Sequence, residues 1–311
     1  MPKPVVTVVG SFAVGMTLRA ARMPVFGETL IGSDFDMGPG GKGSNQAVAA
    51  ARLGAEAHFV GLIGADPLGD MAVGLYGAEG VHAEHLVRDK DLKTGVGFIV
   101  VNPEGKNGII LDMGANRQID RAFVHRAEAQ IAASDAVLAV LEIPLDAAWA
   151  ALDLGRKHGI RTVLNPAPAS ALPEAMFQAV DYLLPNETEL RILLGLGPDD
   201  PAPTAELGRQ LRRRYGTTVV VTRGENGVLL LDERGEHRFP AAAVNVVDTT
   251  GAGDAFTAAF AVALAEGRCV DDAIRFASCH GALACTRLGV IPALAYRSET
   301  DALFARNLSS T

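Results

Sequence analysis

A carboxylate and three small residues stand together at the start of an apolar helix, in the stretch DTTGAGDAF (248–256). Gly251, Ala252 and Gly253 leave backbone N–H groups open at the helix N-terminus, where these groups and the helix dipole form a site for anions. Asp254 follows in the first turn. An acidic residue there is also favourable in a plain helix, but a plain cap does not need three small residues. A base beside an anion site suits phosphoryl transfer, because the carboxylate takes the proton of an attacking hydroxyl.

A second glycine-rich stretch, GPGGKGSN (38–45), resembles known nucleotide-binding patterns. It satisfies the G-x-G-x-x-G pattern of dinucleotide sites, yet it lies far from the first predicted strand, where that pattern belongs. It is not a Walker A loop, because Lys42 is followed by glycine. A third interpretation is flexible backbone that turns Lys42 and Asn45 into a cleft. Asn45 also fits as an ordinary residue of a first helical turn.

Three further stretches place polar side chains after predicted strands. Glu142 stands at the C-terminal end of the apolar strand predicted within DAVLAVLEIPL (135–145). Open α/β sheets bind ligands at that edge, although Glu142 also fits a solvated strand end. Asn186 and Glu189 in PNETE meet the pattern of a helix capping box, so a purely structural role is a strong alternative. The stretch VTRGENG (221–227) follows another strand and also fits a plain hairpin turn.

The elements that must position these residues alternate between strand and helix along most of the chain. This rhythm predicts an α/β fold with a mostly parallel sheet covered on both faces. Two strand-prone segments, about 12–36 and 93–115, interrupt the rhythm. We expect them to pair into a small separate sheet, which must bury one face against a ligand cleft or a second subunit.

Composition bounds the class of protein. The chain has 311 residues, a formal net charge of −8 and three cysteines, with no C-x-x-C pair. An acidic balance does not favour nucleic acid or an anionic membrane as partner. The odd cysteine count argues against a disulfide framework and favours a reducing cytoplasm. The start of the chain lacks the pattern of a signal peptide, and no apolar run approaches the roughly 18 residues of a membrane span.

Taken together, the motifs resemble the ribokinase-like (PfkB) carbohydrate kinases, and within that family they most resemble ribokinase. The resemblance runs from about Val5 to about Ala293. It is carried by GGKGSNQAVAAARLG, LNPAPA, PNETE, VTRGENGV and DTTGAGDAF. The first and last of these match the two signature regions of the family, a specific combination.

The resemblance implies a three-layer α/β/α fold over a single domain, residues 1–311, with a small β lid. It implies that Asp254 is the general base, beside an anion hole of Gly251, Ala252 and Gly253. The other implied roles are contacts to the acceptor by Gly41, Lys42, Asn45, Glu142 and Asp254; contacts to ATP by Asn186, Thr222, Gly224 and Gly227; organisation of Mg²⁺ by Glu189; and a monovalent-cation site, K⁺ for example, at Asp248, Thr250, Ala284, Arg287 and Gly289.

Two departures from the family pattern stand out. Ribokinase has GSxNxD after its first strand, where this chain has GSFAVG, so Ala13 and Gly15 replace an Asn and an Asp that grip ribose. A buried hydroxyl left without a partner costs about 1–3 kcal/mol, so D-ribose should bind poorly. Ala293 replaces a serine at the far end of the cation loop and removes one possible ligand.

We therefore expect a cytoplasmic kinase that uses Mg²⁺ and ATP to phosphorylate a sugar or sugar-like alcohol. The lid is expected to close over the acceptor and to make a homodimer contact, with neither nucleic acid nor membrane as partner. A nucleoside or sugar-phosphate kinase of the same family is the nearest alternative. A non-catalytic, nucleotide-binding regulatory protein is the alternative from another class. Retention of Asp254 beside the intact glycine turn argues against that one, because such a protein has no chemical need of the carboxylate.

Overall fold

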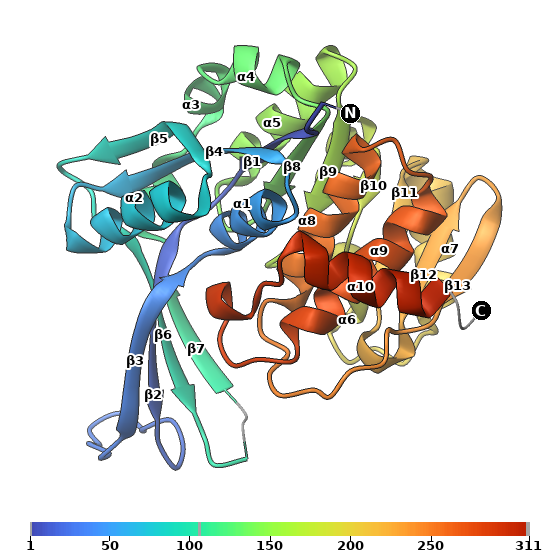
Figure 1. Cartoon of the computed structure of the whole chain (residues 1–311). Coiled ribbons are helices and arrows are strands. Elements are labelled where there is room, and N and C mark those ends of the chain that lie inside the picture. The colour runs from blue at the N-terminus through green and yellow to red at the C-terminus, as the bar shows by residue number, and fades with distance from the viewer. Residues whose placement is uncertain (1, 105–106, 309–311) are drawn as a thin grey trace.

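The computed structural model describes residues 2–104 and 107–308. Its centre is a nine-stranded sheet with the order β13-β12-β11-β10-β9-β8-β1-β4-β5 (Figure 1). The strands from β5 to β11 pair in parallel, and β12 and β13 add an antiparallel hairpin at one edge. The bounds of these strands are Val5–Val9 (β1), Glu56–Gly64 (β4), His82–Asp89 (β5), Ala136–Val140 (β8), Arg161–Asn165 (β9), Tyr182–Leu183 (β10), Thr218–Thr222 (β11), Val228–Asp232 (β12) and Gly235–Phe239 (β13).

The central strands are apolar on both faces, so each face has its own hydrophobic core. In β8, Ala136 and Leu138 contribute to one core, while Val137 and Ala139 contribute to the other. This is the pattern expected of a parallel sheet between helical layers. The three-layer α/β/α fold predicted from the sequence is confirmed.

The helices divide between the two cores. Those that pack on the first core are α1 (Lys42–Arg52), α2 (Pro67–Glu79), α8 (Ala252–Ala265), α9 (Val270–Ala284) and α10 (Arg297–Leu308). Those on the second core are α3 (Arg121–His125), α4 (Glu128–Ala132), α5 (Leu145–Lys157), α6 (Glu187–Leu193) and α7 (Thr204–Tyr215). Single 3₁₀ turns lie at Gly114–Gln118, Glu174–Ala179, Gly224–Asn226 and Ile291–Ala293.

The two interrupting segments pair into a separate four-stranded sheet, as predicted, with the order β3-β2-β6-β7. The strands are β2 (Ala13–Arg19), β3 (Ser33–Gly40), β6 (Gly95–Val101) and β7 (Asn107–Asp112). In Figure 1 this sheet, the lid sheet, extends away from the central sheet. Within the second segment, 93–115, the sequence NPEGKNG (102–108) predicts a turn between two strands; Gly105 and Lys106 of this stretch lie outside the described residues.

One boundary of the lid was wrong. The sequence placed a loop at Gly38–Gly40, whereas these residues continue strand β3 and pair with Ala13–Gly15 of β2. Glycine adopts extended backbone as readily as other residues. Pairing with β2 therefore makes Gly38–Gly40 part of the strand, although the sequence has no strand-like side chains there. Pro39 is tolerated because β3 is the edge strand of its sheet.

Two rows of residues on opposite faces of the lid sheet differ in side-chain size. On one face, Gly15 pairs with Gly38 and Gly97, and Ala13 pairs in the same way with Gly40 and Gly95. On the other face, a row of large apolar residues crosses all four strands, formed by Met37, Met16, Phe98 and Ile110. Neighbouring residues of a strand point to opposite faces, so the two rows lie back to back.

The sequence patterns did not predict some elements, among them β5, β13, α7 and α10. Strand β5 reads HAEHLVRD and lacks an apolar run, because it is the edge strand of the central sheet. Within the part of the chain that the structure describes, no helix has the length and apolar character that crossing a membrane requires.

Candidate active site

The candidate residues meet where the carboxyl ends of the central strands face the N-termini of helices α1 and α8. Glu142 follows β8, and Asn165 is the last residue of β9. Gly41 begins the turn into α1 with φ 90°, and a side chain there would approach Ala13 N to 2.8 Å. Only glycine fits at this position, because the backbone of residues 11–13 passes close to the start of α1.

Asp254 is held by two side-chain amides from helix α1. Asn45 Nδ2 donates to one carboxylate oxygen at 2.8 Å, and Gln46 Nε2 donates to the other at 3.2 Å. Asp254 is only 5% exposed. Both oxygens therefore have a fixed orientation, as a general base requires.

Two residues of this network were missed from the sequence. Gln46 Nε2 also donates to Asn165 Oδ1 at 3.1 Å, and Asn165 Nδ2 donates to the Leu184 carbonyl at 3.2 Å. Signals for both were present: Gln46 follows Asn45 in the glycine-rich motif, and Asn165 ends a buried strand. The rule that selected Glu142 at a strand end applies equally to Asn165.

Glu142 joins three segments of the chain. Its Oε2 accepts from Ser11 Oγ at 2.6 Å and from the backbone N–H of Lys42 at 2.8 Å. The carboxylate thereby connects the end of β1, the start of α1 and the end of β8. Ser11 was not predicted, although it stands directly after the first strand.

The charges of the site are unequal. Lys42 lies among Asp254, Glu142 and Glu189; Asp254 above all, and then the two glutamates, raise the pKa of its ammonium group despite burial. Burial raises the pKa of Glu142 and of Glu189, and Lys42 partly opposes this. Three acidic groups face one ammonium, so a further cation beside them would favour the binding of phosphate.

The N-terminus of α8 is open. Gly251 has φ 80°, and a Cβ there would come within 2.6 Å of Val290 Cγ1, so glycine is required. No side chain caps the helix, and a Cβ on Gly253 would meet nothing within 4 Å. The N–H of Ala252 is partly engaged, since it donates to the Thr249 carbonyl at 3.2 Å.

Asn186 and Glu189 form the capping box that their spacing predicts. Asn186 Oδ1 accepts from the N–H of Glu189, and Glu189 Oε2 accepts from the N–H of Asn186, each at 2.8 Å. Asn186 also bridges to Thr222 at the end of β11. The predicted nucleotide-side residues thus lie side by side, with Gly224 and Gly227 in positive-φ turns directly after Thr222.

The predicted cation loops are joined by Asp248. Its Oδ1 accepts from the N–H and hydroxyl of Thr250, and its Oδ2 accepts from the N–H of Gly289. Burial alone would raise the pKa of Asp248, but these hydrogen bonds outweigh it and lower the pKa. The group stays ionised, as a cation ligand must. Arg287 instead pairs with Glu299, and Ala284 is buried in α9.

Comparison with known proteins agrees with this geometry. The pfkB family carbohydrate kinase model matches residues 3–295. Ribokinase of Haemophilus influenzae is 36% identical over 294 residues, 94% of this chain and 96% of the relative.

The chain belongs to the pfkB family of carbohydrate kinases.

Other relatives agree with that assignment. Deoxyribokinase of Salmonella typhi is 34% identical, over 91% of this chain and 93% of the relative. Arabidopsis thaliana ribokinase, solved in complex with ribose and ATP, matches with a TM-score of 0.90 and 29% identity, over 97% of this chain and 99% of that one. The kinase is accordingly a phosphotransferase that moves a phosphoryl group from ATP to a sugar hydroxyl. The family, fold and activity expected from the motifs are confirmed.

Kinases of this family use Mg²⁺ with ATP, and the residues present fit that ion. The excess of carboxylates around Lys42 supplies the oxygen chemistry that Mg²⁺ prefers. Glu189 is the predicted organiser of the ion, and its position beside the capped start of α6 is well fixed.

Proposed function

We propose that this kinase phosphorylates a sugar-like alcohol other than D-ribose, with Asp254 as the general base. The observation that carries the proposal is the position of Asp254, fixed by Asn45 and Gln46 beside the uncapped N-terminus of α8. The carboxylate accepts the proton of the acceptor hydroxyl as that oxygen attacks the γ-phosphorus, and the bond from the γ-phosphorus to the bridging oxygen breaks, so that ADP leaves. The open N–H groups of α8 stabilise the charge on the transferred group.

Other residues bind the nucleotide and the transferred phosphoryl group. Lys42 places a positive charge beside the developing negative charge, and Glu189 would hold the Mg²⁺ of the bound nucleotide. The Mg²⁺ supplies neutralisation of the phosphate charge. Asn186, Thr222, Gly224 and Gly227 line the nucleotide side. Closure of the lid excludes water and so limits hydrolysis of ATP.

The acceptor preference rests on the glycine face of the lid sheet. Ala13 and Gly15 occupy the positions at which ribokinase grips ribose, and the residues beside them in the sheet are all glycine. A Cβ on Gly38 would meet nothing within 4 Å, and one on Gly15 would meet only ordinary contacts. Around Ala13 and Gly15 this face has few side chains with which to grip hydroxyls, since Thr17 and Asp36 lie two residues further along it. It also leaves room for an acceptor larger than a pentose.

The opposite face of the lid sheet supports a homodimer. Met37, Phe98 and Ile110 are 43%, 40% and 61% exposed, although together with Met16 they form one continuous apolar row. Large exposed apolar patches mark interaction surfaces. Sedimentation of wild type and of Phe98→Asp tests this: the variant should shift to the monomer, and an unchanged state would exclude the row from the contact.

The location proposed for the kinase is the cytoplasm. All three cysteines, Cys269, Cys279 and Cys285, are free. Free thiols are usual in reducing compartments.

A coupled ADP-release screen tests the function. The acceptors should include D-ribose, 2-deoxyribose, hexoses, sugar acids, tetritols, phosphorylated sugars and nucleosides. We expect kcat/KM for D-ribose to fall well below that of the best acceptor. A micromolar KM and the highest kcat/KM for ribose would overturn the acceptor proposal, and no acceptor-dependent turnover in the whole panel would contradict a sugar-like alcohol as the acceptor.

A further inference from the structure

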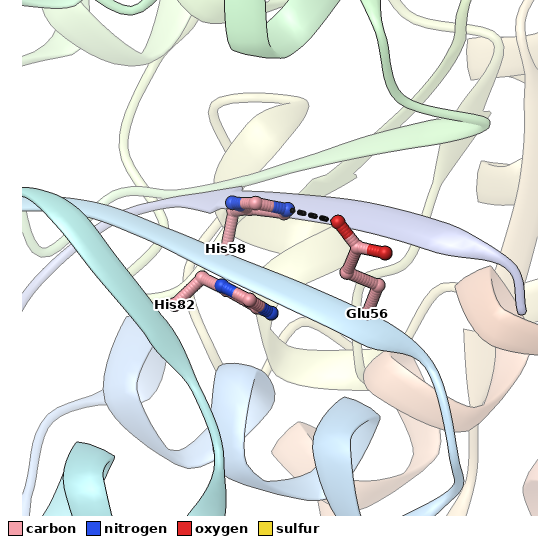
Figure 2. Close-up of side chains that lie close together, drawn as sticks. All are labelled: Glu56, His58 and His82. Carbon is pink, nitrogen blue, oxygen red and sulfur yellow. Dashed lines mark hydrogen bonds and ion pairs between the residues drawn. The ribbon is translucent and has the colours of Figure 1, made fainter.

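Three potential metal ligands gather at the edge of the central sheet, remote from Asp254. Glu56 and His58 lie on β4, and His82 lies on the edge strand β5, directly opposite His58 in the strand pairing. One ligand atom from each residue lies within 4.8 Å of those of the other two. Figure 2 shows the two imidazole rings one over the other, with the Glu56 carboxylate beside them.

The carboxylates on the two sides of the rings have different positions. Glu56 Oε1 lies 3.2 Å from His58 Nε2. Glu84 lies by the other nitrogens, with Oε1 3.4 Å from His82 Nδ1 and Oε2 4.0 Å from His58 Nδ1. Metal-binding histidines commonly direct one nitrogen to the ion and the other to a carboxylate. Glu84 fits that supporting position, which leaves the side of Glu56 for the ion.

The two histidines of the cluster differ in burial, and so in their freedom to rotate. The side chain of His58 is 10% exposed, whereas that of His82 is 44% exposed. The rings are stacked with centroids 4.6 Å apart and 21° between their planes. Nitrogen lone pairs lie in the ring plane, so a shared ion requires the exposed His82 ring to tilt toward His58. The exposure of His82 permits this rotation.

We infer that Glu56, His58 and His82 bind one divalent transition-metal ion, Zn²⁺ or an ion of similar preference. Two imidazoles and one carboxylate form a ligand set that suits Zn²⁺, with a fourth position for water. Glu56 and His58 stand at the beginning of β4, whereas the active site lies at the carboxyl ends of the strands. The ion therefore has no part in phosphoryl transfer and ties the edge strand β5 to β4.

The test uses the full chain without a histidine tag, treated with EDTA and dialysed. Zn²⁺ titration by calorimetry and thermal unfolding are measured for wild type, His82→Ala and Glu56→Gln. His85→Ala is the matched control, because His85 lies on β5 but pairs with Val60, outside the cluster. At a hundredfold excess over Kd, bound Zn²⁺ should raise Tm by about 4 °C.

We expect one Zn²⁺ per chain in wild type and in His85→Ala. His82→Ala and Glu56→Gln should each lose at least tenfold in affinity and most of the rise in Tm. Absence of Zn²⁺ binding in wild type would overturn the inference, as would equal affinity in wild type and both cluster variants. These readouts do not involve turnover, so they stand or fall independently of the proposed acceptor and base.

Discussion

Gln46 Nε2 lies 3.2 Å from Asp254 Oδ1 and so connects helices whose residues are 208 positions apart in the chain. Asn45 makes the matching bond to Oδ2. The carbonyl oxygens of both amides are buried without a hydrogen-bond partner among the described residues. Both amides are therefore oriented by the carboxylate, at the expense of two unpaired acceptors.

Asp254→Asn should keep the fold and nucleotide binding but lower kcat by a factor of roughly 10²–10⁴, the usual share of a general base. The new amide nitrogen would face a donor. Asn45 or Gln46 can relieve this by turning its unpaired carbonyl oxygen toward it. The measurements are steady-state kinetics and ATP titration. A kcat near that of wild type would remove Asp254 from the mechanism.

Gln46→Leu should lower kcat without a comparable change in KM for ATP. The substitution removes one of the two donors to Asp254 and also the bond to Asn165. A hydrogen bond to a charged group contributes about 1.5–3 kcal/mol, so the loss should be roughly 10- to 100-fold. Asn165→Ala is the control, since it leaves the bond of Gln46 to Asp254 in place and removes only the bonds of Asn165 to Gln46 and to the Leu184 carbonyl. Equal losses in both variants would place the effect in packing rather than in orientation of Asp254.

The sequence predicted the central fold because its signals are local. Buried strands such as Ala136–Val140 and the glycine turn at Gly251 show themselves in a few residues. Strand β5 is a polar edge strand without an apolar run. The positions of Gln46 and Asn165 carried local signals, but their contact joins residues 119 positions apart, so no local pattern could show that they meet. The site roles and the single domain over 1–311 stay predictions, whereas the pairing of the two lid segments is confirmed.

Restoring side chains on the glycine face of the lid should improve the use of ribose. Gly15→Asp combined with Ala13→Asn reintroduces the two groups that the resemblance to ribokinase assigns to ribose. A Cβ at Gly15 would lie 3.7 Å from Ile99 Cδ1, an ordinary contact, so the sheet accommodates it. We expect kcat/KM for ribose to rise at least tenfold, with the best wild-type acceptor losing activity. An unchanged value for ribose would show that these positions do not face the acceptor.

His280 should make the fold sensitive to acid. It is fully buried in α9, with Nδ1 2.9 Å from Thr300 Oγ1, and burial lowers its pKa to about 4. The unfolded imidazole binds a proton below about pH 6.5 whereas the folded one does not, so stability falls as the pH drops from about 6.5 to 4. The loss at pH 5 is about 2 kcal/mol.

His280→Leu isolates this contribution. Urea unfolding at pH 7 and pH 5 should show a smaller loss of stability in the variant, because carboxylates that titrate in the same range are common to both proteins. The comparison uses the difference between the two pH values, which cancels the change in packing that the substitution itself causes. An equal loss in variant and wild type would mean that His280 binds a proton without unfolding.

The last prediction concerns the monovalent cation. K⁺ should raise activity several-fold over Na⁺ at constant ionic strength, since a cage of backbone carbonyls favours the larger ion. The loop after α9 lies directly behind the proposed anion hole, with Val290 against Gly251, and the Cys285 carbonyl accepts from the N–H groups of Val247 and Asp248. An ion between these loops would brace the helix start that receives the phosphoryl group.

Asp248→Ala should erase the K⁺ effect together with much of the activity. Asp248 joins Thr250 to Gly289 and brings the formal negative charge to these loops. Arg287→Ala is the control: its guanidinium pairs with Glu299, so any cation ligand at Arg287 is its carbonyl, and the K⁺ effect should survive. Constant ionic strength matters because added salt alone screens the phosphates. Equal rates in K⁺, Na⁺ and a bulky organic cation would show that the loops work without an ion, in keeping with the buried Ala293 at the place of the family's serine.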